Sequence, residues 1–205
     1  MWRKLTAVEL WSGVSRERFD GSGAVGQNRR MNTLGEADPG TTPFRVCFVC
    51  AGNICRSPMA ESVFTDLVAA AGLERVVEVS SAGTGDWHVG EHADHRTVTA
   101  LRAHGHDATA HRAKQFDPDR FDSYDLVVAL DRSHERILRA WAGNDTDRSK
   151  VHLLLSFDST SGTRDVPDPY YSDAQMFETV LGMIDHACRS LFHQLEPALT
   201  QGATP

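Results

Sequence analysis

The chain has 205 residues, of which 40% are hydrophobic and 24% charged, and its formal net charge is −7. This is the composition of a globular protein that can bury a core without disulfides or metal ions. The acidic balance argues against a nucleic-acid-binding protein, which is usually basic, although a few backbone N–H groups and one arginine can still form a local anion site.

Residues 1–43 differ in composition from the rest of the chain. They are rich in glycine, serine, threonine and proline and have little apolar periodicity. A mostly disordered leader is therefore predicted here, with a short helix over residues 5–14. Translation is expected to start at or near Met31; a regulatory or targeting tail is the alternative, and no residue pattern favours it.

From residue 45 onward, short apolar runs alternate with segments of helical periodicity. Strands are predicted over residues 46–49, 76–80, 126–130 and 151–155, and helices over residues 57–72, 92–104 and 133–141 and from about residue 173. In the first of these helices, Ser57 is the expected N-cap, Pro58 the first helical residue and Gly72 the end. The last helix has one apolar face, which consists of Phe177, Val180, Leu181, Ile184, Cys188 and Leu191.

The alternation of strands and helices predicts an α/β fold, because parallel βαβ units place helices on both faces of one sheet. We expect a single domain over residues 44–196 with a four-stranded, mainly parallel sheet, followed by a tail over residues 197–205. No apolar run follows the basic N-terminus as in a signal peptide, and none approaches the roughly 18 residues of a membrane span. A cytoplasmic location with reduced thiols is expected, and export by another route is left open.

The residues that carry chemistry are concentrated in the sequence CAGNICRS, residues 50–57. This segment lies between the first strand and a helix N-terminus, where an open α/β sheet binds ligands and where backbone N–H groups attract anions. Gly52 gives the loop conformational freedom, and Arg56 offers paired donors for two phosphate oxygens. Cys50, expected as the first residue after the strand, can direct its sulfur to the centre of the loop, where positive surroundings favour the nucleophilic thiolate.

The other cysteines have simpler explanations. Cys47 and Cys50 have the spacing of a dithiol redox motif or of half a zinc site, but Cys47 lies within an apolar strand, where an inert buried thiol is common. Cys188 lies on the apolar face of the last helix and is expected in the core. Three histidines within residues 88–95 are explained by a solvated loop and helix face, so no metal site is predicted.

The sequence VCAGNICRSPMAE, residues 49–61, resembles the signature of the low-molecular-weight protein tyrosine phosphatases. The resemblance implies that Cys50 attacks phosphorus, that Arg56 binds the phosphoryl group and that Ser57 supports the thiolate. The other loop residues expected at the substrate site are Ala51, Gly52, Asn53, Ile54 and Cys55.

The same resemblance implies supporting residues around the loop. Asn53 resembles the asparagine that holds the shape of the loop, with Ser81 as its partner. Asp131, at the end of the third predicted strand, resembles the family's aspartate near the loop. We expect it to position Arg56 or the acid rather than to react.

A phosphomonoesterase needs a proton donor for the leaving oxygen, and Asp168 is the candidate. Composition alone favours a plain surface turn here, but the sequence DPYY, residues 168–171, resembles the family's general-acid loop. Residues 172–176 depart from the more usual glycine-containing, acidic stretch, which leaves the fine conformation of the loop open. Trp87 and Tyr170 resemble the family's rim aromatics, whose flat faces suit an aryl phosphate.

These features predict a protein tyrosine phosphatase, with a resemblance that covers residues 44–193. Cys50 would form a phosphocysteine while Asp168 protonates the phenolate, and Asp168 would then activate water; no cofactor is required. Expected partners are phosphotyrosine-containing proteins and small aryl phosphates, with no nucleic acid and no membrane. The alternatives are an arsenate reductase on the same fold, which needs further redox cysteines, and a non-catalytic phosphotyrosine-binding module, which needs neither nucleophile nor acid.

Overall fold

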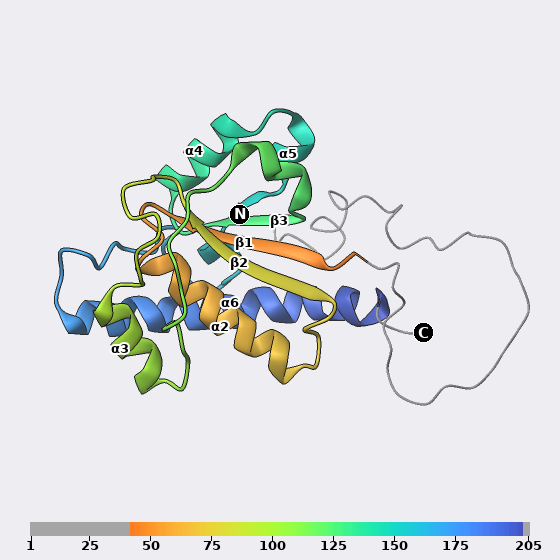
Figure 1. The fold of residues 1–205 in the computed structure, drawn as a ribbon. Helices are drawn as coiled ribbons and strands as arrows, with labels where there is room; N and C mark the ends of the chain where they lie inside the picture. Colours follow the sequence, from red (N-terminus) through yellow and green to blue (C-terminus); the bar gives the residue numbers. More distant parts are fainter. Residues whose placement is uncertain (1–41, 203–205) are drawn as a thin grey trace, which may run out of the picture.

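The computed structural model describes residues 42–202 (Figure 1). The predicted short helix over residues 5–14, the start near Met31 and nearly all of the predicted leader lie outside the described residues. The predicted domain limits at residues 44 and 196 and the predicted tail after them stay predictions.

A four-stranded sheet forms the centre of the fold (Figure 1). Its strands are β1 (Phe44–Cys50), β2 (Val77–Gly83), β3 (Leu126–Ala129) and β4 (Val151–Leu153), in the spatial order β2-β1-β3-β4. All three strand pairs are parallel, and Cys50 at the end of β1 lies opposite Gly83 at the end of β2. The prediction of a four-stranded parallel sheet is confirmed, and the strand ends meet at the edge where such sheets bind ligands.

Helices cover both faces of the sheet, as predicted. The helices α2 (Arg56–Ala70), α3 (His95–Ala103) and α6 (Ala174–Gly202) lie on one face, and α4 (Arg132–Trp141) and α5 (Asp145–Ser149) on the other (Figure 1). Alternate residues of β1 pack on opposite faces: Val46 and Phe48 join the core with α2 and α6, whereas Cys47 and Val49 join the core with α4. Both faces of the central strand are therefore buried, which explains its continuous apolar sequence.

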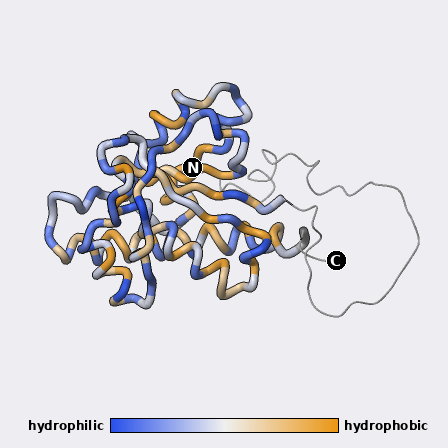
Figure 2. Tube along the Cα trace, viewed as in Figure 1, coloured by the Kyte–Doolittle hydropathy of each residue, from blue (hydrophilic) through white to orange (hydrophobic). Residues whose placement is uncertain are grey.

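The long helix α6 buries the apolar face that the sequence predicts. The buried residues are Phe177, Val180, Leu181, Ile184, Cys188 and Leu191. Figure 2 shows hydrophobic and hydrophilic residues interspersed along the helices, as expected for helices with one side in the core. Within residues 42–202, no helix has the length and apolar character that a membrane span requires.

The beginning of α2 differs from the prediction. The helix begins at Arg56, and its N-cap is Cys55, which makes no side-chain cap hydrogen bond, so the prediction of Ser57 as N-cap is wrong. Pro58 is accordingly the third helical residue. The Ser57 hydroxyl instead lies 3.0 Å from the sulfur of Cys50. Because no side chain caps them, the first N–H groups of the helix are left for an anion.

Other elements differ from the prediction in their limits or were not predicted. The helix α3 begins at His95, later than predicted, because Asp94 is its N-cap and accepts a hydrogen bond from Arg96 N. The strand β4 is shorter than predicted and is followed by the 3-10 helix η3 (Leu154–Ser156). The 3-10 helix η2 (Pro118–Ser123) and the helix α5 were not predicted, because such short segments show no helical period.

Candidate active site

Cys50 lies at the carboxyl edge of the sheet, and the loop that follows it leads directly into α2. It is the last residue of β1 rather than the first residue after the strand. Two backbone hydrogen bonds join the loop to the segment after β2, from Thr84 N to Cys50 O (2.8 Å) and from Gly85 N to Ala51 O (2.9 Å). A Cβ at Gly83 would lie 2.6 Å from Ala51 O, so the close approach of the two segments requires glycine there.

The Cys50 thiol lies beside the Ser57 hydroxyl. The sulfur and the hydroxyl oxygen are 3.0 Å apart, and only 3% of Cys50 is exposed. The hydroxyl oxygen of Ser57 also accepts a hydrogen bond from Asn53 Nδ2 (2.9 Å) and can donate to Ala82 O (3.3 Å). These contacts hold the hydroxyl where it can donate to a thiolate, and the N-terminus of α2 adds a positive field at the same place.

Asn53 is at the centre of the hydrogen bonds that shape the loop. It is fully buried and has a φ of 56°, in the left-handed region that asparagine tolerates better than most residues. Its Nδ2 donates to Ser57 and to Ser81 Oγ (2.8 Å), and its Oδ1 accepts from Lys114 N (2.9 Å). Its backbone oxygen lies 2.7 Å from His111 Nε2. The pairing with Ser81 that the resemblance implies is present.

Two further polar residues extend this network and were not predicted. The hydroxyl of Ser81 donates to Glu61 Oε2 (2.5 Å), and His111 Nδ1 lies 3.4 Å from the same carboxylate. Burial raises the pKa of Glu61, but the hydrogen bonds from His111 and Ser81 outweigh this and hold the pKa below its ordinary value. Glu61 ends the signature segment and lies one helical turn after Ser57, so the sequence could have indicated that it lies near the loop. The sequence offers no such signal for His111.

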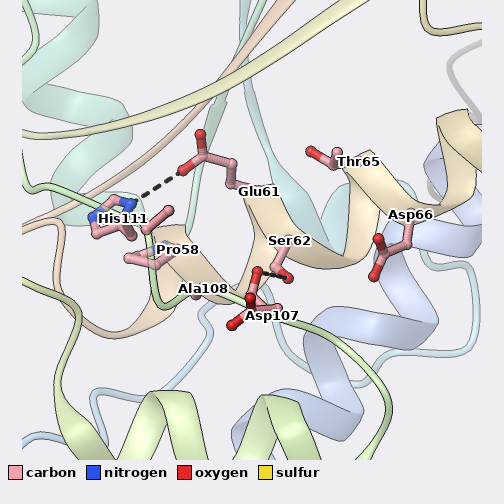
Figure 3. Close-up of a pocket in the computed structure, with 9 residues that line it drawn as sticks. Pro58, Glu61, Ser62, Thr65, Asp66, Asp107, Ala108 and His111 are labelled. Carbon is pink, nitrogen blue, oxygen red and sulfur yellow. Dashed lines mark hydrogen bonds and ion pairs between the residues drawn. The ribbon is translucent and has the colours of Figure 1, made fainter.

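A pocket of about 310 Å³ opens beside α2, next to this network (Figure 3). Its walls come from α2 and from residues 107–111 and include the ion pair of Glu61 with His111 and the hydrogen bond from Ser62 to the backbone oxygen of Asp107. None of the predicted site residues lines it. The pocket therefore adjoins the support of the loop and is not the candidate active site.

Arg56 is the buried cation of the site, with 4% of its surface exposed. Its Nη1 donates to Asp131 Oδ2 (2.8 Å) and to the backbone oxygen of Val166 (3.1 Å), and its Nη2 donates to Asp168 Oδ2 (2.7 Å). Its Nε is buried and has no hydrogen-bond partner within residues 42–202. A buried guanidinium donor is costly to leave unpaired, and a phosphate oxygen is the kind of acceptor that suits it.

Asp131, just after β3, connects Arg56 to the helix α4. Its Oδ1 caps the helix by accepting from Ser133 N (2.8 Å) and His134 N (3.0 Å), while its Oδ2 accepts from Arg56. Burial raises the pKa of Asp131, but the hydrogen bonds from Ser133 and His134 and the charge of Arg56 outweigh this and lower the pKa. The carboxylate thus lies where it can position Arg56, which is one of the two roles predicted for it.

Asp168 approaches Arg56 from an irregular segment between η3 and α6. Its side chain is 50% exposed, and its two oxygens accept from Arg56 Nη2 and from Tyr170 N (3.2 Å). A plain surface turn does not explain why this carboxylate faces a buried guanidinium. The geometry favours the assignment of Asp168 as the acid, which stays a prediction.

Three rings form a row beside the loop. The ring centroids of Trp87 and His88 are 6.4 Å apart, and those of His88 and Tyr170 are 6.3 Å apart. A Cβ at Gly52 would lie 2.7 Å from His88 Cδ2 and 3.3 Å from Trp87 Nε1, so glycine is needed for this close packing, whereas the positive φ occurs at Asn53. Trp87 is 62% exposed, whereas the His88 side chain is 21% exposed because it lies beside both other rings.

The other three cysteines, Cys47, Cys55 and Cys188, are buried and free. Burial raises the pKa of Cys47 and of Cys55 to about 12, and it also raises the pKa of Cys188. These thiols stay protonated near neutral pH, so none of them competes with Cys50 as the candidate nucleophile toward phosphorus. Among the described residues, no group of three or more histidine, cysteine, aspartate or glutamate side chains could hold a metal ion.

Comparison with known proteins gives concordant matches. The family model described as low molecular weight phosphotyrosine protein phosphatase matches residues 45–200. The chain is 52% identical over 150 residues to the low molecular weight protein-tyrosine-phosphatase of Streptomyces coelicolor. This alignment covers 72% of this chain and 91% of the relative. The chain is also 47% identical over 161 residues to the low molecular weight protein-tyrosine phosphatase A of Mycobacterium tuberculosis, and that alignment covers 78% of this chain and 96% of the relative.

Solved structures agree with these sequence matches. YfkJ from Bacillus subtilis has a TM-score of 0.72 at 38% identity, and the match covers 77% of this chain and 97% of that one. A protein tyrosine phosphatase from Entamoeba histolytica, with Hepes in its active site, has a TM-score of 0.72 at 30% identity. The match covers 76% of this chain and 98% of that one. The matches take in nearly the whole of the described chain.

Proposed function

The chain belongs to the low molecular weight protein-tyrosine-phosphatase family, and we propose that it removes phosphate from phosphotyrosine in proteins through a phosphocysteine on Cys50. One observation carries the proposal: a buried arginine, Arg56, begins α2 at the end of the loop that starts at Cys50, and its Nη2 holds the carboxylate of Asp168 at 2.7 Å. This arrangement supplies a nucleophile, an anion-binding cation and an acid, which together are the groups that hydrolysis of a phosphate ester requires.

In the first proposed step, the Cys50 thiolate attacks phosphorus. The S–P bond forms while the bond from phosphorus to the phenolic oxygen breaks, and the electron pair of that bond goes to the oxygen. Asp168, in its protonated form, gives its proton to this oxygen, so that tyrosine leaves as the neutral phenol. Arg56, the loop N–H groups and the N-terminus of α2 stabilise the charge on the three remaining phosphoryl oxygens.

In the second proposed step, water hydrolyses the phosphocysteine. Asp168, now a carboxylate, takes a proton from water while the water oxygen attacks phosphorus. The P–S bond breaks, inorganic phosphate forms and Cys50 returns to the thiolate. The hydroxyl of Ser57, 3.0 Å from the sulfur, can donate a hydrogen bond to the thiolate as it leaves.

The proposed substrates are phosphotyrosine-containing proteins, with small aryl phosphates as further substrates. Trp87 and Tyr170 support this choice, because flat rings beside the loop suit an aromatic leaving group. The proposed compartment is the cytoplasm, where Cys50 would stay reduced. The arsenate reductase alternative has little support, because Cys47 and Cys188 are both buried and cannot readily relay a disulfide.

The test is a comparison of phosphotyrosine, phosphoserine and phosphothreonine peptides as substrates, by release of inorganic phosphate. We expect hydrolysis of the phosphotyrosine peptide, inhibition by vanadate and no effect of EDTA. The matched control is Cys188→Ser, which alters a buried thiol away from the loop and should keep the activity, whereas Cys50→Ser should abolish it. Hydrolysis that survives in Cys50→Ser would contradict the phosphocysteine mechanism.

A further inference from the structure

The segment that carries Asp168 packs on the fold through Pro169 and Tyr170, but few hydrogen bonds attach it to the rest of the fold. Residues 167–173 form no helix or strand. In the part of the chain that the structure describes, three hydrogen bonds connect this segment to distant residues. One comes from Arg56 to Asp168, and the other two come from Arg96 of α3 to the backbone oxygens of Tyr170 (3.0 Å) and Ser172 (3.1 Å).

Arg96 is itself held firmly. Its Nε and Nη2 donate to the two oxygens of Asp94, at 3.0 Å and 2.8 Å. Its guanidinium lies over the ring of Phe177, 4.5 Å from the centroid, and 5.7 Å from the centroid of Tyr170. Burial raises the pKa of Asp94, but the hydrogen bonds from Arg96 outweigh this and keep the carboxylate ionised. The planar guanidinium is therefore fixed with two N–H groups directed at the Asp168 segment.

Asp94 connects Arg96 to the phosphate-binding loop, which runs from Cys50 to Cys55 and leads into α2. Its backbone N–H donates to the backbone oxygen of Ile54 (2.9 Å). A continuous path of hydrogen bonds thus runs from the loop at Ile54, through Asp94 and Arg96, to Tyr170. This path fixes the distance between the two halves of the site without involving any reacting group.

The two arginines that hold the segment have different roles in the proposed reaction. Arg56 must offer its donors to the phosphoryl oxygens, and these compete with Asp168 for the same N–H groups. The hydrogen bonds from Arg96 end on backbone oxygens and meet no such competition. They can hold the segment throughout the reaction.

We propose that Arg96 is a positioning residue that holds the Asp168 segment against the phosphate-binding loop and so places the acid at the leaving oxygen. The proposal rests on the proposed function, because it assumes that Asp168 is the acid. Arg96 acts through the backbone of Tyr170 and Ser172. Its loss should therefore impair proton donation and leave Cys50 and Arg56 as they are.

The test compares two substrates that differ in their need for a proton. Arg96→Met keeps an aliphatic stem and removes the guanidinium. Its kcat/KM for a phosphotyrosine peptide should fall about 10- to 100-fold, a part of the roughly 10²–10⁴ that a general acid supplies, whereas kcat/KM for 2,4-dinitrophenyl phosphate should stay within about threefold. Arg96→Lys keeps the charge beside Asp94 and should recover part of the loss.

The controls separate positioning from stability and from the proposed function. Arg102→Met changes an exposed arginine of the same helix and should leave both values of kcat/KM unchanged. An equal loss on both substrates in Arg96→Met would overturn the positioning role while the proposed function stands. Wild-type chain that hydrolyses neither ester would overturn both. If Arg96→Met does not fold, Arg96→Lys and Arg96→Gln are compared in the same way, and an equal loss on both substrates again decides against the proposal.

Discussion

Replacing Asn53 by alanine would remove the residue that shapes the phosphate-binding loop. The side chain is buried and makes three hydrogen bonds, to Ser57, Ser81 and the backbone N–H of Lys114. Its φ of 56° lies in a region that alanine adopts only at a cost. The variant would therefore lose both the ties between the loop and its surroundings and the residue that suits its backbone.

The expected loss can be estimated from these contacts. A buried hydrogen bond contributes about 0.5–1.5 kcal/mol net, and the left-handed conformation costs alanine roughly 1 kcal/mol. Allowing for partial relaxation of the loop, we expect Asn53→Ala to lower the free energy of unfolding by about 2–4 kcal/mol. Because the loop N–H groups would no longer converge on one point, kcat/KM for phosphotyrosine should fall by at least about 10², the usual effect of losing one oxyanion donor.

Urea unfolding and the rate of phosphate release measure these two effects. Asn144→Ala is the matched control: Asn144 caps α5 by accepting from Asp147 N (2.8 Å), outside the site. It should lower the free energy of unfolding by about 1 kcal/mol and leave kcat/KM unchanged. If Asn53→Ala were no less stable than Asn144→Ala, or kept wild-type activity, the argument that Asn53 shapes the loop would be wrong.

Four substitutions test the other parts of the site. Cys50→Ser should abolish turnover but still bind phosphotyrosine in calorimetry, and near-normal turnover would exclude Cys50 as the nucleophile. Asp168→Ala should lower kcat/KM for phosphotyrosine by about 10²–10⁴ and that for an activated aryl phosphate by less; equal rates for wild type and variant would make Asp168 a turn residue. Mild peroxide should oxidise Cys50 to a sulfenic acid, which condenses with the Cys55 thiol to a disulfide and releases water. Mass spectrometry should detect this disulfide, and Cys55→Ser should recover less activity than wild type under dithiothreitol; full recovery without a Cys50–Cys55 peptide would remove the protective role. The folded-state pKa of Glu61 lies below its ordinary value of 4.5, so its ionised form stabilises the fold above that pH and this contribution is lost as the pH falls through the lowered pKa. As the pH falls below 4.5, Glu61→Gln should therefore lose less unfolding free energy than wild type in urea titrations, and parallel curves would contradict this.

The strands could be predicted because both faces of this parallel sheet are buried. Their sequences are continuous apolar runs, such as residues 46–49 and 126–130, which are visible without tertiary information. The long helix α6 could be predicted for a related reason, since its buried residues recur at the helical period. The short helix α5 has only 5 residues, too few to show a period.

The rule for helix starts predicts Ser57 as a cap, whereas its importance in the structure comes from its contact with Cys50. A serine before a proline commonly begins a helix, so the sequence favours a cap. In the structure the N-cap is Cys55, two residues earlier, and the Ser57 hydroxyl lies against Cys50. A cap and a thiolate partner both require a hydroxyl near a helix N-terminus, so local sequence rules do not separate the two roles.

The residues that were not predicted have partners far away along the chain. His111 contacts the backbone oxygen of Asn53, 58 positions earlier, and Arg96 contacts that of Tyr170, 74 positions later. Periodicity and short motifs describe neighbours in sequence, and neither residue belongs to the signature segment (residues 49–61) or to the DPYY segment (residues 168–171). Arg96 reaches its partner because α3 packs beside α2 and α6, whereas His111 lies in the segment after α3, which hydrogen bonds of Lys114 tie to Asn53 and Gly83.

The Asp168 segment is the part of the site that no strand leads into directly. Cys50 ends β1 and Asp131 closely follows β3, so parallel pairing alone brings both to one edge of the sheet. Asp168 follows no strand, since η3 and an irregular segment separate it from β4. The backbone hydrogen bond from Val166 N to Leu130 O (2.9 Å) anchors the chain just before Asp168, and the hydrogen bonds of Arg56 and Arg96 hold the segment itself. We therefore expect proton donation, rather than nucleophilic attack, to be the step most sensitive to substitutions outside the signature segment, which leaving-group dependence measured across such variants would reveal.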